Sequence, residues 1–412
     1  MRILVVLLAG PILLGGCGDE GESVCAWQAD AIADAANRFS NCGDAVCISD
    51  AVQVVPSDSL PSRARTQEAN NNLDVVSHKC RVFLAFRTAP SHFASAETRL
   101  YVVSSADQQT WRFEGGFHLE TDLREPRFLS YKGDLFLYFG VLGSDPLDFH
   151  PQGMMVSRYL GVERWTEPEW FYGEGFMPWR TKVVDGVPYM LAYVGGENIY
   201  DVNGEPIRVH WLTTGDGFEW VPAVPGQPVV IEGGASETDF VFLDDGTLIA
   251  VSRNEAGDEQ TGWGSKICRA EADSLGDWHC VGDYKKYDSP FMFKHNNVPY
   301  IIGRRNLSET GDYYLGHTEK TPKDQTIAYQ LDYWNWPKRT SLWRVDPENL
   351  TVEFVKDFPS RGDTCFPGLL TAAEGLFEVY NYTSPLEGED LSWIDGQNGP
   401  TSIVRTGMKL EP

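Results

Sequence analysis

The chain has 412 residues and a formal net charge of −25 at pH 7. Nucleic acid and anionic membrane surfaces would repel so acidic a chain, so we expect neither to bind it directly. Its 40 Gly, 24 Pro, 13 Trp, 17 Tyr and 21 Phe predict many short aromatic strands joined by tight turns. The length suits several ordinary domains or one large repeat architecture, and this composition favours the repeat.

Residues 1–17 have the features of an export signal. Met1-Arg2 precedes an apolar run, Ile3 to Leu14, which is too short to span a bilayer comfortably. The sequence Leu14-Gly-Gly-Cys17 resembles a bacterial lipobox. This resemblance implies cleavage before Cys17, lipidation of its thiol and anchoring to the cell envelope, on the periplasmic side or at the cell surface. An ordinary signal peptide that contains a cysteine is the alternative.

Residues 18–64 are expected to form a tether and a short disulfide-containing segment, with a helical stretch at Cys25–Phe39 that is rich in Ala. Export permits disulfides. One bond is expected among Cys25, Cys42 and Cys47, and Cys268 and Cys280 flank a predicted hairpin and form a second pair. An odd number of cysteines follows Cys17, which leaves at least one unpaired. No CxxC spacing typical of zinc sites occurs.

Two markers recur at roughly 55-residue intervals through residues 65–412. The first marker is a tryptophan that closes a turn, at Trp111, Trp165, Trp220 and Trp278. The second is a hairpin tip between two apolar strands, at Cys80, Gly133, Gly186, Gly246, Asn297 and Gly375. The last interval is longer because residues 307–340 form an insertion rich in Tyr and Trp.

Six hairpin tips predict six four-stranded sheets, each too small to bury its own faces. Such sheets stack around an axis, so the sequence predicts an all-β fold, a six-bladed β-propeller over residues 65–412 with a short helical appendage before it. A linear array of sandwich domains is the alternative. It would require linkers, and none is visible beyond residue 65.

One position of the repeat carries an unusual set of side chains. Seven residues after the six tips stand Arg87, Gly140, Tyr193, Arg253, Arg304 and Tyr382. In a propeller, the ends of these strands return to one face, so we expect the side chains to converge on a central pocket. Grouped guanidinium groups need an anion between them, and arginine binds carboxylates in a bidentate fork. Three unrelated salt bridges are the alternative.

Acidic side chains around this position could balance the arginines or take part in chemistry. These are Asp122, Glu125, Glu237, Asp239, Asp288 and Asp363. Arg124, Tyr193 and Tyr382 are expected to contact a ligand as well.

The segment from Glu237 to Arg253, an acid followed 16 residues later by an arginine, resembles the blade-four motif of the sialidase (neuraminidase) superfamily. Phe86-Arg87 and Gly303-Arg304 resemble its other arginine motifs, and the turns ending at Trp111 and Trp220 resemble its Asp boxes. The resemblance implies a sialidase-like propeller in which Arg87, Arg253 and Arg304 bind the carboxylate of an acidic glycan.

The sequence departs from that family at two positions. Phe366 occupies the place of the tyrosine nucleophile, and phenylalanine cannot form a covalent glycosyl intermediate. The segment Thr88–Thr98, which should supply an aspartate acid/base, contains no Asp and offers His92 and Glu97 instead.

Three functions remain compatible with these residues. A glycoside hydrolase would use Glu237 or Asp363 as a base toward water and His92 as an acid, without a nucleophile. For His92 a loop-stabilising role is the alternative, and for Glu237 neutralisation of Arg253. A non-catalytic glycan-binding lipoprotein would stack sugars on aromatic residues of the insertion, which are Tyr313, Tyr314, Tyr333, Trp334 and Trp336. A polysaccharide lyase would abstract a proton with Tyr193, Tyr382 or a histidine. We expect a monomer that needs no cofactor or metal.

Overall fold

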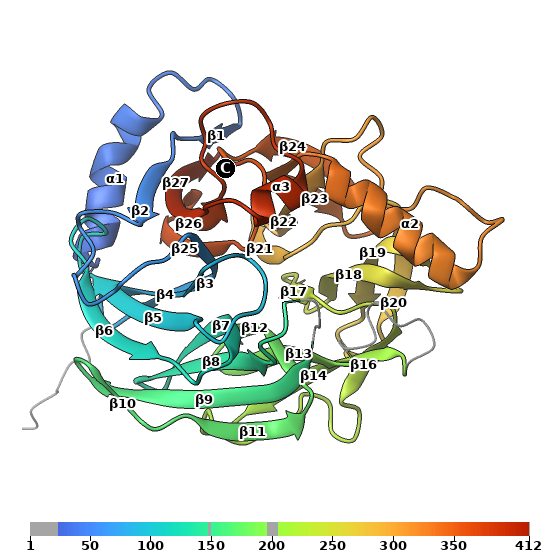
Figure 1. The fold of residues 1–412 in the computed structure, drawn as a ribbon, viewed down its shortest axis with the longest axis horizontal. Helices are drawn as coiled ribbons and strands as arrows, with labels where there is room; N and C mark the ends of the chain where they lie inside the picture. The colour runs from blue at the N-terminus through green and yellow to red at the C-terminus, as the bar shows by residue number, and fades with distance from the viewer. Residues whose placement is uncertain (1–23, 147–149, 196–204, 412) are drawn as a thin grey trace, which may run out of the picture.

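The structure is a computed structural model that describes residues 24–146, 150–195 and 205–411. Within these residues, six antiparallel sheets surround a central axis (Figure 1). This arrangement confirms the predicted all-β six-bladed propeller. The expected signal segment and Cys17 lie outside the described residues. No helix in the described part of the chain is long and apolar enough to cross a membrane.

The first three blades are built outward from the axis in chain order. Blade one contains β3 (Ala69–His78), β4 (Arg81–Ala89), β5 (Arg99–Ser105) and β6 (Arg112–Phe117). Blade two contains β7 (Asp122–Tyr131), β8 (Asp134–Leu142), β9 (Pro151–Gly161), β10 (Arg164–Trp165) and β11 (Glu169–Glu174). Blade three contains β12 (Met177–Val184), β13 (Val187–Val194), β14 (Ile207–Thr214), β15 (Trp220–Pro222) and β16 (Val229–Gly233).

The last three blades follow the same order, with one exception at the outer edge of blade six. Blade four contains β17 (Thr238–Phe242), β18 (Leu248–Asp258), β19 (Gly262–Ala270) and β20 (His279–Asp283). Blade five contains β21 (Phe291–His295), β22 (Val298–Asn306), β23 (Lys338–Asp346) and β24 (Thr351–Asp357). Blade six contains β25 (Gly368–Ala373), β26 (Leu376–Thr383) and β27 (Ser402–Leu410). Helices α2 (Pro322–Asn335) and α3 (Trp393–Gln397) lie in the connections before β23 and β27.

The outer edge of blade six is supplied by the N-terminal segment. Strands β1 (Val46–Ile48) and β2 (Val52–Val55) both pair antiparallel with β27. The expected helix is present as α1 (Ala26–Arg38), which packs beside β25 (Figure 1). The segment expected as an appendage therefore completes the last blade through β1 and β2. The pairing was missed because these strands are short and lie outside the repeat.

The hairpin tips have the backbone conformation that a two-residue turn between twisted strands requires. At four of the six, both turn residues have positive φ: Lys79-Cys80, Lys132-Gly133, Asp185-Gly186 and Asn296-Asn297. Two-residue turns with positive φ at both positions match the right-handed twist of the flanking strands. The mirror-image turns would push the two strands apart. The strand after each tip lies where the sequence predicts it, from β4 to β26.

The recurring tryptophans mark the contact of each blade with the one before it. The ring of Trp220 in blade three lies 5.6 Å from that of Tyr138 in blade two. Trp165 of blade two donates its Nε1–H to the Glu114 carbonyl oxygen of blade one, at 2.9 Å. The ring of Trp111 meets Tyr380 of blade six at 6.4 Å, across the seam of the ring. The periodic aromatic residues therefore fill the spaces between blades.

Three disulfides are present in the described residues: Cys25–Cys80, Cys42–Cys47 and Cys268–Cys280. Both expected pairings are confirmed, and Cys365 is free and buried. The bond between Cys25 and Cys80 joins the start of α1 to the hairpin tip of blade one, a partnership the sequence did not indicate. Three disulfides are typical of a protein that folds in an oxidising compartment outside the cytosol.

The Cys25–Cys80 bond should contribute more stability than the Cys42–Cys47 bond. It closes a loop of 55 residues, against 5 for Cys42–Cys47. Chain-entropy arguments predict losses of about 4 and about 2 kcal/mol when the two bonds are replaced by serine pairs. Chemical denaturation of the two double variants measures both. Equal losses of unfolding free energy in the two variants would show that loop length does not determine what each disulfide contributes.

Candidate functional site

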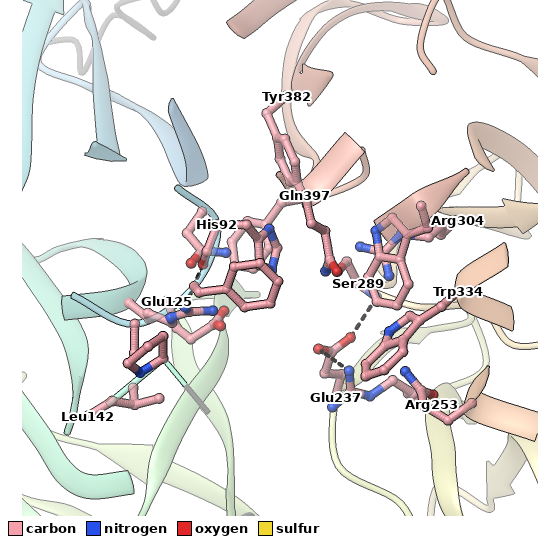
Figure 2. Close-up of a pocket in the computed structure, with 18 of the residues that line it drawn as sticks. His92, Glu125, Leu142, Glu237, Arg253, Ser289, Arg304, Trp334, Tyr382 and Gln397 are labelled. Atoms are coloured by element: carbon pink, nitrogen blue, oxygen red, sulfur yellow. Dashed lines mark hydrogen bonds and ion pairs between the residues drawn. The ribbon is translucent and has the colours of Figure 1, made fainter. Parts of the chain in front are cut away.

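A cavity of about 530 Å³ opens at one end of the propeller axis, and all six blades contribute to its lining. The residues expected from the sequence that line it include His92, Arg124, Glu125, Tyr193, Glu237, Arg253, Arg304 and Tyr382. Figure 2 shows His92 and Glu125 on one side of the cavity and Glu237, Arg253 and Arg304 on the other. The register of the repeat therefore brings side chains of four different blades to one place.

Arg87 does not face this cavity, which corrects its expected position. Its guanidinium group is completely buried and bonds to the Asp122 carboxylate, with Nη2 at 2.7 Å. It also donates to the carbonyl oxygens of Ser91 and Phe93 at 3.2 and 2.9 Å. The loop after β4 folds back over Arg87, so this side chain holds the loop in place. Arg124 lines the cavity on this side instead.

His92 sits on that loop and is oriented by a buried carboxylate. Its Nδ1 lies 2.6 Å from Asp363 Oδ2, while Tyr382 and Trp393 both donate to Oδ1 at 3.0 Å. Arg124 fixes the same loop by donating to the His92 carbonyl oxygen at 2.6 Å. Asp363 is fully buried and fully engaged, so it cannot act on water directly. Its expected role as a base is replaced by that of a residue that orients His92.

The charge states of this pair follow from their surroundings. Burial lowers the pKa of His92 below its usual value, and the Asp363 charge only partly opposes this effect. Burial would raise the pKa of Asp363, but His92, Arg304 and the Tyr382 hydroxyl together hold it below its ordinary range. At neutral pH we therefore expect Asp363 ionised and His92 neutral. An ionised carboxylate can only accept, so His92 donates from Nδ1 and its Nε2 is a proton acceptor.

Glu237 and Arg253 form an ion pair on the opposite wall. Arg253 Nη1 lies 2.9 Å from Glu237 Oε1, and the Ser289 backbone N–H donates to Oε2 at 2.7 Å. Burial raises the pKa of Glu237, and the nearby Asp288 adds to this, whereas Arg253 opposes it. Glu255 is a second partner of Arg253, at 3.3 Å. Among the described residues the guanidinium uses Nε and Nη1, which leaves its Nη2 for a ligand.

Glu125 is a cavity carboxyl group whose surroundings raise its pKa well above the ordinary value. Burial raises its pKa to about 7; Arg127 opposes the shift and Glu237 adds to it. The nearest cation is Arg127, whose Nη2 is 3.7 Å from Glu125 Oε2, and that oxygen has no hydrogen-bond partner in the described part of the chain. Glu125 lies in an irregularity of β7, between Arg124 and Arg127, with φ of 53°. This bulge turns the carboxyl group toward the pocket.

Arg304 and Phe366 complete the floor. Arg304 pairs with Asp288 at 2.7 Å and donates to the Thr364 carbonyl oxygen, also at 2.7 Å. The Phe366 ring is buried against the guanidinium of Arg127, 4.3 Å from its centre. Phe366 carries no oxygen, so this part of the floor offers no nucleophile.

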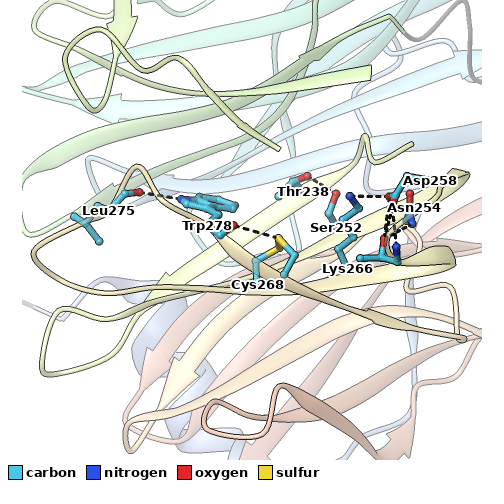
Figure 3. The surroundings of a disulfide bond; sticks show 10 residues. Thr238, Ser252, Asn254, Asp258, Lys266, Cys268, Leu275 and Trp278 are labelled. Carbon is cyan, nitrogen blue, oxygen red and sulfur yellow. Dashed lines mark hydrogen bonds and ion pairs between the residues drawn. A yellow bond between two sulfur atoms is a disulfide. The ribbon is translucent and has the colours of Figure 1, made fainter. Parts of the chain in front are cut away.

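Blade four holds Arg253 rigidly. The disulfide Cys268–Cys280 ties β19 to β20 (Figure 3). Next to Arg253, the Ser252 and Thr238 hydroxyls lie 2.7 Å apart, and Asn254 donates to the Gly262 carbonyl oxygen at 2.8 Å. The strand that carries the arginine is thus bonded on both sides.

The insertion contributes a helix, which the sequence did not predict. In α2, Tyr329 and Tyr333 are buried, and with Tyr313, Trp263 and Trp393 they form one apolar cluster. Tyr313 and Tyr333 therefore serve packing rather than sugar stacking. Trp334 lines the cavity, whereas Trp336 is exposed outside its lining. In the described residues no group of three or more His, Cys, Asp or Glu is placed to hold a metal ion.

No protein-family model and no curated protein matches the chain by sequence. Among solved structures, a protein of unknown function from Dyadobacter fermentans superposes with a TM-score of 0.58 at 14% identity, covering 89% of this chain and 100% of that one. The Trypanosoma rangeli sialidase in complex with sialic acid gives 0.54 at 12% identity over 89% of this chain. This chain spans only 59% of that sialidase.

A second structure of the same sialidase, the covalent intermediate with 2,3-difluorosialic acid, gives a TM-score of 0.56 at 11% identity over 89% of this chain and 59% of that one. At such identities the likeness establishes the fold alone. The sialidase-like propeller expected from the sequence is thereby confirmed.

Proposed function

We propose that the cavity binds a sugar bearing a carboxylate and hydrolyses its glycosidic bond. The observation that carries the proposal is the opposition of two carboxyl groups, Glu125 and Glu237, across a cavity whose walls also carry Arg124, Arg253 and Arg304. Three guanidinium groups suit an anionic ligand. Two carboxyl groups with different proton affinities suit acid–base hydrolysis.

The surroundings of the two carboxyl groups assign their roles. Glu125 Oε2 has no hydrogen-bond partner among the described residues, and the raised pKa of about 7 keeps the group partly protonated at neutral pH, so Glu125 acts as the acid. Glu237, paired with Arg253 and the Ser289 N–H, is the base. Glu237 takes a proton from water as the water oxygen bonds to the anomeric carbon. The glycosidic C–O bond breaks, and the leaving oxygen takes the Glu125 proton. This single displacement inverts the anomeric configuration and needs no nucleophile where Phe366 stands. His92 accepts a hydrogen bond from a sugar hydroxyl.

The pH profile of turnover follows from the pKa of Glu125. Since the acid must be protonated, kcat/KM should fall about tenfold per pH unit above pH 7. The Glu125→Gln variant should lose this alkaline limb, together with about 10²-fold or more of the rate. Rates measured from pH 5 to 9 test both. An alkaline limb that survives in Glu125→Gln would assign the acid to another group.

A screen of acidic glycosides and oligosaccharides tests the function itself. Hydrolysis releases a reducing sugar, and NMR of the fresh product reports its anomeric configuration. Inversion supports the proposed pair, and retention contradicts it. Binding of acidic glycans without any turnover would instead make the protein a glycan-binding protein.

A polysaccharide lyase is the second candidate, and the His92–Asp363 pair favours it. A neutral imidazole held by a buried carboxylate can abstract a proton next to a carboxylate that arginines neutralise. A lyase leaves an unsaturated product that absorbs in the ultraviolet, whereas a hydrolase does not. The same screen, read by absorbance, separates the two.

We further propose that a lipid on Cys17 anchors the protein to the bacterial envelope. The lipobox-like Leu14-Gly-Gly-Cys17 supports this proposal. In a bacterial host the full chain should fractionate with membranes and the Cys17→Ala variant should not. Equal fractionation of the two would contradict the anchor.

A further inference from the structure

Helix α2 buries several polar side chains and leaves two aliphatic side chains exposed. The face packed on the propeller buries the polar residues Gln325, Thr326 and Gln330 beside the tyrosines. Ile327 and Leu331 are 46% and 51% exposed. Helices of soluble proteins normally turn their aliphatic side chains inward. Exposed aliphatic residues next to a pocket are typical of binding surfaces.

These side chains form a stripe on the cavity wall. Lys323, Ile327, Leu331 and Trp334 follow one another at intervals of four, four and three residues, which places them on one side of the helix. All four line the cavity that holds the carboxyl groups. Phe93, Leu142 and Pro146 also line it, and Figure 2 shows Leu142 and Trp334 on opposite sides. The cavity therefore combines charged groups with an apolar wall.

The stripe is not needed to hold α2 in place. The Trp263 Nε1–H donates to Thr326 Oγ1 at 3.0 Å, and the Tyr333 hydroxyl donates to Asp288 at 3.0 Å. Lys286, buried beneath the helix, bonds to Glu255 at 2.7 Å and to Gln330 at 3.3 Å. These contacts all lie on the packed face. Ile327 and Leu331 are free to serve a ligand.

We infer that the aliphatic part of the α2 stripe, Ile327 and Leu331, binds an alkyl or acyl chain attached to the acidic sugar, so that the substrate is an amphiphile. This inference rests on the proposed function, because the charged part of the same cavity would hold the sugar. Ile327 and Leu331 provide neither hydrogen bonds for hydroxyl groups nor a flat ring on which a sugar can stack. A hydrocarbon chain leaves water on contact with them, and affinity rises with each methylene buried.

The test compares pairs of ligands that differ only in chain length. Methyl and octyl β-D-glucuronides, and methyl and octyl α-glycosides of N-acetylneuraminic acid, are titrated by calorimetry below their micelle concentrations. Octyl β-D-glucoside serves as the uncharged amphiphile. The octyl form of an acidic sugar should bind about tenfold or more tighter than its methyl form. In the double variant Ile327→Ser/Leu331→Ser, this advantage should shrink to about twofold.

Ile32→Ser is the matched control, because Ile32 is also 46% exposed and lies on α1, outside the cavity lining. It should leave the octyl advantage unchanged, and thermal unfolding checks that every variant is folded. Equal binding of methyl and octyl acidic sugars overturns the inference and leaves the proposed function standing. Octyl glucoside binding as tightly as the acidic octyl sugars upholds the stripe and contradicts an acidic substrate. If no ligand binds, both are wrong.

Discussion

Replacing Glu237 with Gln should lower kcat by about 10²- to 10⁴-fold while leaving the affinity for the same glycoside within about threefold. Glutamine has the same shape and can still accept the Ser289 N–H that Glu237 holds at 2.7 Å. It cannot take a proton from water. Rapid-mixing kinetics and calorimetry on one substrate separate the two quantities.

The ion pair Arg344–Glu353, on the surface of blade five, supplies the control for this experiment. Both side chains are more than half exposed, so Glu353→Gln changes the same atoms without touching the cavity. It should leave kcat unchanged. A Glu237→Gln variant that turns over at the parent rate would remove Glu237 from the chemistry and leave it as the neutraliser of Arg253.

Replacing Arg253 with Ala should weaken binding of a carboxylate-bearing ligand by about 100-fold, and binding of the matching carboxamide by much less. The reason is that the guanidinium contributes a charge-assisted hydrogen bond that an amide accepts only weakly. Affinity is the appropriate measurement here. Loss of Arg253 also removes the cation beside Glu237, which raises the pKa of that carboxyl group further and impairs turnover indirectly.

Arg344→Ala is the corresponding control and should bind both ligands as the parent does. The ratio of acid to amide affinity is the decisive number, because a general distortion of the pocket weakens both ligands together. An unchanged ratio in Arg253→Ala would mean that Arg253 serves only Glu237 and Glu255.

The repeat predicted the fold and much of the pocket because a propeller places equivalent residues of each blade at equivalent points around its axis. That rule holds for Tyr193, Arg253, Arg304 and Tyr382, all in the cavity lining. It fails for Arg87, because a side chain's surroundings depend on the loops as well as on its strand. The loop after β4 covers Arg87 and supplies His92 in its place.

Two features of the site depend on local departures from regular structure. Glu125 reaches the cavity through an irregularity of β7 at Glu125-Pro126. The proline was a signal for it, because a proline inside a paired strand is typical of a bulge. The sequence also held two signals for the start of helix α2. Thr321 caps the first turn by accepting a hydrogen bond from the Asp324 N–H, and Pro322 follows at the first helical position. The many aromatic residues of the insertion favoured a sugar-stacking interpretation, and the helix signals were overlooked.

The closure of the ring by β1 and β2 imposes an order on how the protein is made. These strands lie within residues 46–55 and pair with β27, which ends at Leu410, so they have no partner until the rest of the chain has emerged. Contacts so distant in sequence form late and slowly.

Cys25 and Cys80, by contrast, both emerge early, and their bond can secure α1 to blade one while the later blades are still arriving. A chain interrupted before β27 would expose the unpaired edge of β26, the kind of edge that quality-control proteases and aggregation act on.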